Sequence, residues 1–307
     1  MVASATADPG VEIAGLRRLS GGASRETWAF DAAHGDGRIT PLILRRDPPG
    51  APKAGMAIEA ALMRAAAREG VPVPEVLAAD ESSLIMDRVE GETIPRRILR
   101  DAAYASARPR LAGECGRILA AIHRIPPAAV PGLVGGDPVA QWRDQLDGLG
   151  QPHPALELGL RWLDAHRPPA RREVVVHGDF RNGNLIVGAD GIRAVLDWEL
   201  AHLGDPVEDL GWLCVKAWRF GVDQPVGGFG AYGELLDAYE DESGIRVSAE
   251  ELRWWEVLGT LRWGVICILQ ATVHTSGLLR SVELAAIGRR VCENEWDLLA
   301  LLPTGWP

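Results

Sequence analysis

Residues 174–187, VVVHGDFRNGNLIV, followed by residues 194–199, AVLDWE, decide the fold of this chain. The valines predict a short buried strand that ends in a loop at His177, Gly178 and Asp179. Asn184 comes five residues after Asp179, and Asp197 comes thirteen residues after Asn184. Residues 185–187 and 192–196 are predicted to pair as a hairpin around a turn at 189–191. Two carboxylates and one side-chain amide are therefore spaced along a single strand–loop–hairpin unit.

This spacing fits phosphoryl transfer, a reaction that needs little covalent help from a protein. It needs a carboxylate to orient and deprotonate the attacking hydroxyl, which Asp179 can supply. It also needs hard oxygen ligands to hold magnesium on the phosphates, which Asn184 and Asp197 can supply. The same order and spacing occur in the H-R-D-x-x-x-x-N and D-F-G signatures of kinases.

The bulk composition excludes several other classes of protein. With 47% hydrophobic and 24% charged residues, the chain has the composition of a folded protein. Its net charge of −10 and the lack of a basic stripe argue against a nucleic-acid partner. The four cysteines show no C-x-x-C spacing, which argues against a zinc site and a disulfide scaffold.

A cytoplasmic location without membrane attachment is expected. Residues 1–10 carry neither a basic residue nor an apolar core, so no signal or transit peptide is predicted. The most apolar stretch, residues 257–273, is interrupted by Arg262 and Gln270 and is shorter than a membrane span needs. A buried helix is the better interpretation of that stretch, and its tryptophans Trp254, Trp255 and Trp263 are expected in the core or along an acceptor pocket.

The order of elements predicts an α+β protein with two lobes. The first lobe, residues 1–88, is expected to bind nucleotide with a small antiparallel sheet and one helix. Its predicted strands are residues 16–19, 26–31, 42–45, 75–79 and 83–87, and its helix covers 53–69. The second lobe, residues 89–307, is expected to carry catalysis and the acceptor. Its predicted helices are 108–125, 139–149, 155–166, 206–220, 231–243, 249–275 and 282–302.

The signature H-G-D-F-R-N-G-N followed by D-W-E resembles the aminoglycoside phosphotransferase and choline kinase superfamily, as does G-D-P-V-E-D-L at 204–210. More narrowly, GGASRETW (21–28), LRRDPPG (44–50) and RWGVICILQ (262–270) resemble kinase-like domains related to those fused to some acyl-CoA dehydrogenases. The resemblance covers about residues 12–302. It implies a protein-kinase-like fold with ATP and Mg²⁺ as cofactors.

The resemblance also implies one role for each matched residue of the second lobe. Asp179 would be the catalytic base, and Asn184 and Asp197 would be the magnesium ligands. His177 would support the loop, while Asp209 would anchor it from the following helix. Glu199 is either a second magnesium ligand or a structural hydrogen-bond acceptor.

In the first lobe, Arg45 occupies the position where kinases place a phosphate-binding lysine. Strand alternation puts Ile43 and Arg45 on one face, so Ile43 could cover the adenine while Arg45 reaches the phosphates. Glu59, the only acid between Lys53 and Arg68, is the natural ion-pair partner of Arg45.

Two more parts of a nucleotide site are expected there. Residues 20–24, which include Ser24, would form the turn over the phosphates, although S-G-G-A-S is not G-x-G-x-x-G. A hinge at Met86, Asp87 and Val89 would pair its backbone with adenine. Arginine in place of lysine is not conservative, because its planar fork binds oxygens differently from a point charge.

The function expected from these features is transfer of the γ-phosphate of ATP to a hydroxyl of a small molecule. The alternative is a non-catalytic nucleotide-binding module, suggested by Arg45 and by the irregular phosphate turn. A protein kinase is a weaker third hypothesis, because the chain has H-G-D and D-W-E and lacks A-P-E. The sequence predicts neither the identity of the acceptor nor the oligomeric state.

Overall fold

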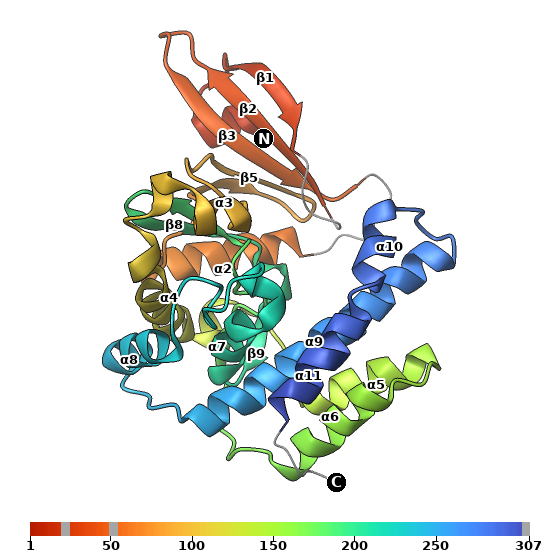
Figure 1. Ribbon diagram of the computed structural model, residues 1–307. Coiled ribbons are helices and arrows are strands. Elements are labelled where there is room, and N and C mark those ends of the chain that lie inside the picture. Colours follow the sequence, from red (N-terminus) through yellow and green to blue (C-terminus); the bar gives the residue numbers. More distant parts are fainter. Residues whose placement is uncertain (20–24, 49–54, 303–307) are drawn as a thin grey trace.

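The computed structural model describes residues 1–19, 25–48 and 55–302, and it has two lobes (Figure 1). The small lobe is built on an antiparallel sheet with the strand order β1-β2-β3-β5-β4. Its strands are β1 Glu12–Arg18, β2 Glu26–Ala33, β3 Ile39–Arg46, β4 Val76–Ala79 and β5 Ser83–Asp87. Two helices accompany them, α1 Val2–Thr6 and α2 Met56–Arg68. The predicted α+β class and antiparallel first lobe are therefore confirmed.

Strand β3 separates two apolar clusters by its period-2 alternation. Leu42 and Leu44 belong to a small cluster with Phe30 and Ile85, on the side where Val2 of α1 packs. On the other face, Ile43 packs against the main core of the molecule. Because Arg45 shares the face of Ile43, the alternation directs its side chain toward the second lobe.

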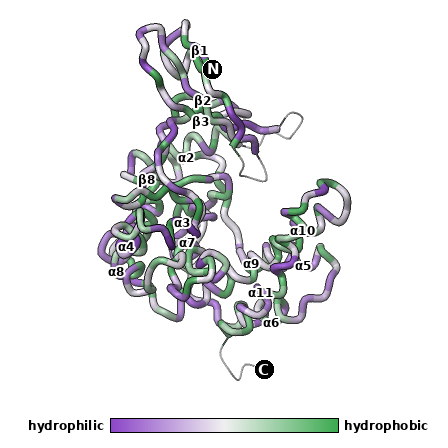
Figure 2. Tube along the Cα trace, turned by 45° about the horizontal axis from the view of Figure 1, so that its top comes forward, coloured by the Kyte–Doolittle hydropathy of each residue, from purple (hydrophilic) through white to green (hydrophobic). Residues whose placement is uncertain are grey.

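The large lobe is mainly helical. Its α-helices are α3 Pro95–Arg100, α4 Arg108–His123, α5 Pro138–Leu149, α6 Pro154–Ala165, α7 Val207–Cys214, α8 Tyr232–Ser243, α9 Ala249–Thr275, α10 Val282–Gly288 and α11 Val291–Leu301. Figures 1 and 2 show α4 beside α8 on one side, with α5, α6, α10 and α11 gathered along α9 on the other.

Two short strand pairs lie inside this helical lobe. Strand β6 (Val174–Val176) pairs with β9 (His202–Gly204), and β7 (Leu185–Gly188) pairs with β8 (Gly191–Val195). Both pairs are antiparallel. The predicted hairpin is therefore present, and β6 delivers the following loop from the buried core.

Helix α9 is long and apolar enough to cross a membrane by length and composition. In this fold it packs against α6, α7, α10 and α11, and its residues Val257, Leu261 and Val265 lie in the main core. Trp254 and Trp255 are also buried there, which agrees with their predicted position in the core.

The structure differs from the predicted elements in several places, including helix α1, which was not predicted. The helix predicted over 206–220 ends at Cys214, because Val215 takes an extended backbone (φ −54°, ψ 133°); a 3₁₀ turn, Lys216–Arg219, follows. The helix predicted over 282–302 divides into α10 and α11, which lets both pieces pack on α9. Helix α3 and strand β9 were not predicted, because each is too short to show a period.

Candidate active site

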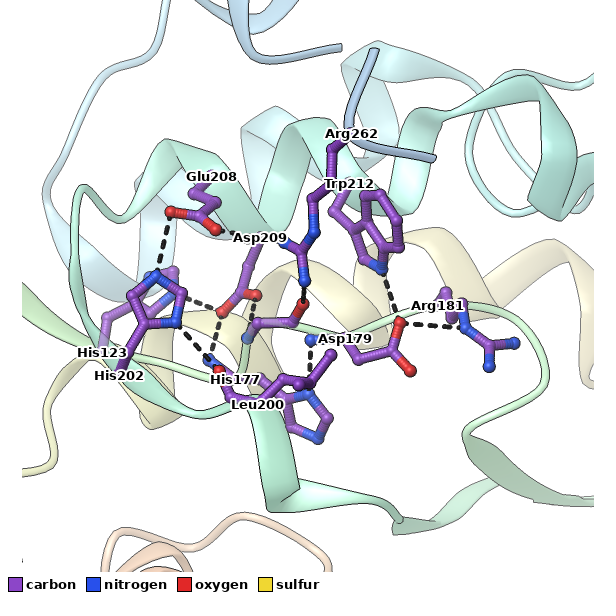
Figure 3. Close-up of polar contacts among 11 residues, drawn as sticks. His123, His177, Asp179, Arg181, Leu200, His202, Glu208, Asp209, Trp212 and Arg262 are labelled. Carbon is purple, nitrogen blue, oxygen red and sulfur yellow. Dashed lines mark hydrogen bonds and ion pairs between the residues drawn. The ribbon is translucent and has the colours of Figure 1, made fainter. Parts of the chain in front are cut away.

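The loop after β6 holds Asp179 in a buried position, and Figure 3 shows the contacts of its carboxylate with Trp212 and Arg181. Its Oδ1 accepts hydrogen bonds from the indole of Trp212 (2.8 Å) and from Nε of Arg181 (3.0 Å). Its Oδ2 accepts a hydrogen bond from Nδ2 of Asn184 at 2.6 Å. Three donors thus set the orientation of this carboxylate before any substrate binds.

Asn184 contacts Asp179, and Asp197 follows the residue that pairs with the backbone of Asn184. The amide of Leu196 donates to the carbonyl of Asn184 (2.8 Å), which places Asp197 next to the loop. Asp197 adopts a left-handed backbone (φ 68°), an uncommon conformation for a residue other than glycine. Its Oδ1 receives Nη2 of Arg45 at 2.9 Å from the small lobe.

The oxygens of these two residues fit a magnesium ion. Nδ2 of Asn184 donates to Asp179, while its Oδ1 accepts no hydrogen bond from residues 1–19, 25–48 and 55–302. Oδ1 of Asp197 contacts Arg45, and its Oδ2 contacts no donor among the same residues. Magnesium is commonly held by one or two carboxyl or amide oxygens together with phosphate oxygens and water, and this donor set fits that chemistry.

Asp209, on α7, anchors the loop (Figure 3). Its fully buried carboxylate accepts hydrogen bonds from the backbone amides of His177 (2.7 Å) and Gly178 (2.9 Å). Nε2 of His123 lies 3.2 Å from the same carboxylate. Burial alone would raise the pKa of Asp209, but the contact with His123 and the amide donors lower this pKa overall. The carboxylate therefore stays ionised.

His177 is built into the loop and does not reach the solvent. Its Nδ1 accepts the amide of Asp179 (3.1 Å), and its Nε2 lies 3.1 Å from the carbonyl of Leu196. One neutral tautomer, with the proton on Nε2, satisfies both contacts. Burial lowers the pKa of His177, which also favours this neutral form.

In the small lobe, Arg45 and Glu59 form the predicted ion pair between Nη1 and Oε1. Glu59 lies on α2 and is 2% exposed. Burial alone would lower the pKa of Arg45, but the carboxylates of Glu59 and Asp197 raise it overall. Arg45 therefore stays charged and links α2 to the large lobe.

Arg25 is a site residue that the sequence did not reveal. Its Nη1 contacts Oε2 of Glu59, and it lies 3.5 Å from a carboxylate oxygen of both Asp47 and Glu199. Arg25 lies inside the GGASRETW stretch that carries the resemblance, but no role was predicted for it from the sequence, and only the fold brings the residue before β2 to Glu59 on α2.

The structure also places the predicted adenine-side residues. Ile43 on β3 stands opposite Met86 on β5, and Val89 is half-buried after the strand. The carboxylate of Asp87 accepts the backbone amide of Glu75, and burial raises the pKa of Asp87. Ser24 and the rest of the predicted phosphate turn lie outside the described residues.

A pocket of about 840 Å³ opens in the large lobe between α5, α9 and the segment leading to β9. Its walls include Trp142, Leu200, Trp255 and Arg262. Arg262 joins this pocket to the catalytic loop, because its Nη2 donates to the carbonyl of Gly178 at 2.6 Å (Figure 3).

Arg262 is also linked to Asp179 through an aromatic neighbour. Its guanidinium lies 4.3 Å from the ring centroid of Trp212, whose indole binds Asp179. In the sequence, Arg262 stood out only as a charged residue that interrupts an apolar stretch, and no role was predicted for it.

Comparison with known proteins decides the family. The family described as "Phosphotransferase enzyme family" matches residues 15–247, a range that contains Arg45, Asp179, Asn184, Asp197 and Asp209. The chain belongs to this family. The resemblance inferred from the H-G-D signature is thereby confirmed.

Among curated relatives of this phosphotransferase is acyl-CoA dehydrogenase family member 10 of Mus musculus. The two are 34% identical over 193 residues, which make up 57% of this chain and 18% of that relative. Acyl-CoA dehydrogenase family member 11 of Homo sapiens is 30% identical over 230 residues, 63% of this chain and 29% of that relative. The chain therefore spans less than a third of the length of either protein.

Solved structures confirm the kinase-like fold of this phosphotransferase. A provisionally assigned aminoglycoside phosphotransferase from Ralstonia eutropha JMP134 superposes with a TM-score of 0.76 at 23% identity, covering 94% of this chain and 92% of that one. A spectinomycin phosphotransferase, solved with ADP and spectinomycin, gives a TM-score of 0.67 at 14% identity, covering 95% and 94%. The family and the fold together identify a phosphotransferase of kinase type.

Proposed function

We propose that this phosphotransferase moves the γ-phosphate of ATP to a hydroxyl group of a small molecule. One observation carries the proposal: the carboxylate of Asp179 is oriented by three donors, one of which is Asn184, whose backbone pairs with the residue before Asp197. A carboxylate held in this way is suited to accept the proton of an attacking hydroxyl.

Asp179 is the proposed base of the reaction. Two donors occupy Oδ1 and one occupies Oδ2, so Oδ2 has more remaining capacity to accept a hydroxyl proton. The rigid anchoring of the loop by Asp209 keeps this oxygen in place. Positioning of this kind accounts for most of the catalysis in phosphoryl transfer.

Asn184 and Asp197 are the proposed magnesium ligands. When bound, Mg²⁺ would be held by Asn184 and Asp197 and would offset the negative charge of the phosphates. Arg45 is positioned to contribute further positive charge from the small lobe, because it lies against Asp197. Met86, Asp87 and Val89 are the proposed hinge beside the adenine, with Ile43 covering the base from β3.

The proposed acceptor site is the 840 Å³ pocket, because Arg262 and Trp212 connect its wall to Asp179. Its volume suits a small molecule. Ligands seen in structural neighbours support a small acceptor and a nucleotide donor, since one neighbour binds spectinomycin and ADP. The tryptophan walls and the carboxylates of Glu199 and Glu208 offer both apolar contact and hydroxyl acceptors.

A second candidate is a nucleotide-binding module without turnover. The observation that favours it is the ion pair of Arg45 with Asp197, which occupies one oxygen of a proposed magnesium ligand. In this alternative the arginine keeps Asp197 from the metal, and ATP binds without being consumed.

Phosphorus NMR separates the two candidates. The protein is incubated with ATP, MgCl₂ and pools of aminoglycosides, sugars, amino alcohols and hydroxy acids. The proposal predicts a new phosphoester signal and an equal amount of ADP with at least one pool. ATP binding by calorimetry with no phosphoester from any pool would support the module instead.

A further inference from the structure

Six charged side chains from both lobes meet between α2 and the large lobe, and we call them the ionic cluster. They comprise two arginines and four acids: Arg25, Arg45, Asp47, Glu59, Asp197 and Glu199. The nucleotide site predicted from the sequence uses only Arg45 and Glu59 of the small-lobe members. The nucleotide site predicted from the sequence therefore gives Arg25 no role.

Glu59 lies between the two arginines. Nη1 of Arg25 contacts its Oε2, and Nη1 of Arg45 contacts its Oε1. The three side chains are nearly excluded from solvent, with exposures of 5% for Arg25, 13% for Arg45 and 1% for Glu59. One buried carboxylate thus fixes two guanidinium groups side by side.

The charge of this trio differs from that of a kinase small lobe. There, one lysine pairs with one glutamate, and the two charges cancel. Here, two arginines share one glutamate, and arginine stays protonated at every relevant pH. The trio alone has one positive charge in excess, but with Asp47, Asp197 and Glu199 the ionic cluster has four carboxylates against two guanidinium groups. The placement of the two guanidinium groups side by side, and not a net positive charge, is therefore what suits them to phosphate oxygens.

The second guanidinium also faces the proposed metal side of the cleft. Arg45 reaches Oδ1 of Asp197 at 2.9 Å, and Nη1 of Arg25 lies 3.5 Å from Oε2 of Glu199. Asp197 and Glu199 flank Trp198 in the D-W-E stretch. Both arginines therefore point at the segment beside which the terminal phosphates of a nucleotide are expected.

We propose that Arg25 is a second phosphate-binding residue, which acts together with Arg45 on the terminal phosphates of the nucleotide; this proposal rests on the proposed function. A guanidinium offers two parallel donors to phosphate oxygens, which a lysine cannot do. The pair of arginines takes the place of the single lysine of other kinases.

A purely structural role for Arg25 makes a different prediction. If Arg25 only held Glu59 and Asp47 in place, its loss would reach the phosphates indirectly, through Arg45, and Arg25→Lys, which keeps a donor for Glu59, would retain the parent's preference for ATP over AMP. Direct contact of the guanidinium with the terminal phosphates instead predicts that Arg25→Lys also loses part of that preference.

Calorimetric titration of the full chain with Mg·ATP, Mg·ADP and AMP distinguishes these roles. The variants are Arg25→Met, Arg25→Lys and Arg46→Met. Arg46 is the matched control, because it follows Arg45 on β3 but is 43% exposed and pairs with Glu26. The ratio of ATP to AMP affinity is the readout, because it does not depend on the fraction of protein that is folded.

Arg25→Met is expected to lower the affinity for Mg·ATP about 10- to 100-fold and that for AMP less than about twofold. Arg25→Lys keeps the charge and a donor for Glu59, so it is expected to fold as the parent does. Its affinity for Mg·ATP is expected to fall about three- to tenfold. Arg46→Met is expected to keep the parent ratio.

Two results would overturn the proposal in distinguishable ways. If the parent protein prefers ATP and both Arg25 variants keep that preference, Arg25 does not bind phosphate, while the proposed function stands. If the parent protein itself shows no preference for ATP over AMP, the proposed function fails, and the role of Arg25 fails with it.

Discussion

Nη2 of Arg45 lies 2.9 Å from Oδ1 of Asp197, although 152 positions separate the two residues in the chain. This ion pair joins the small lobe to the proposed metal ligand of the large lobe. Because Arg45 occupies one carboxylate oxygen of Asp197, we expect metal binding by Asp197 to depend on Arg45. A substitution of either residue therefore tests the role of the other.

Replacing Asp197 by asparagine is expected to abolish measurable phosphate transfer and to weaken Mg²⁺-dependent ATP binding about tenfold or more. An amide oxygen is a weaker ligand for a hard cation than a carboxylate is. Binding of ATP with and without Mg²⁺ checks the prediction by calorimetry. A variant whose binding still strengthens on addition of Mg²⁺ as the parent's does would remove Asp197 from the metal site.

Replacing Asp209 by asparagine is expected to lower the free energy of unfolding by about 2–4 kcal/mol near neutral pH. The carboxylate accepts two backbone amides, and an asparagine NH₂ group would face one of those N–H groups. Urea denaturation followed by tryptophan fluorescence measures the difference. Equal stability of parent and variant would contradict the anchoring role.

The same pair of proteins predicts a pH dependence. The pKa of Asp209 is lowered from its ordinary value of 3.8, so its contribution to stability is present above that pH and is lost as the pH falls below it. The stability difference between parent and Asp209→Asn is therefore expected to be constant above about pH 5 and to shrink below about pH 4. A stability difference between the two proteins that grows as the pH falls would contradict the lowered pKa of Asp209.

Replacing Arg262 by methionine is expected to reduce the rate of ATP consumption about 10- to 100-fold while changing Mg·ATP affinity less than about threefold. Arg262 holds the carbonyl of Gly178, the residue before the proposed base, and does not touch the small-lobe residues. Steady-state kinetics and calorimetry separate the two effects. Arg253→Met serves as control, because Arg253 is exposed on the same helix; parallel loss in both variants would argue against a specific role.

A matched pair of glycines tests the packing of α7 on α9. A Cβ at Gly211 would lie 2.5 Å from Cβ of Trp255, whereas one at Gly148 on α5 would meet nothing within 4 Å. Gly211→Ala is expected to cost about 1–3 kcal/mol of stability. Gly148→Ala is expected to stabilise by about 0.5–1 kcal/mol, because it removes chain entropy from an exposed helix. Thermal unfolding of both variants measures the contrast, and a neutral Gly211→Ala would show that the helices can separate freely.

The parts of the site predicted from the sequence are those set by local geometry. Asp179 and Asn184 share one loop, so their contact follows from spacing. The orientation of Arg45 follows from alternation along β3, and its pairing with Glu59 follows from the lone acid in the helix after it. These relationships need only the period of a strand, a short loop and the family pattern.

The parts that were missed depend on tertiary contacts. Arg25 reaches Glu59 only because the fold brings the residue before β2 to α2, and the GGASRETW stretch that contains it did not indicate this contact. Trp212 and Arg262 reach the loop only because α7 crosses α9. The end of α7 at Cys214 likewise reflects the backbone of Val215, a residue without a helix-breaking side chain.

The central claim is that Asp179 is the base of a Mg·ATP-dependent transfer, and Asp179→Asn tests it most directly. Asparagine keeps an oxygen to accept the hydrogen bond of Trp212 but cannot take a proton. The account predicts that the variant binds Mg·ATP within about threefold of the parent while its rate of phosphate transfer, followed by phosphorus NMR, falls about 10²- to 10⁴-fold. An unchanged transfer rate in Asp179→Asn would contradict it.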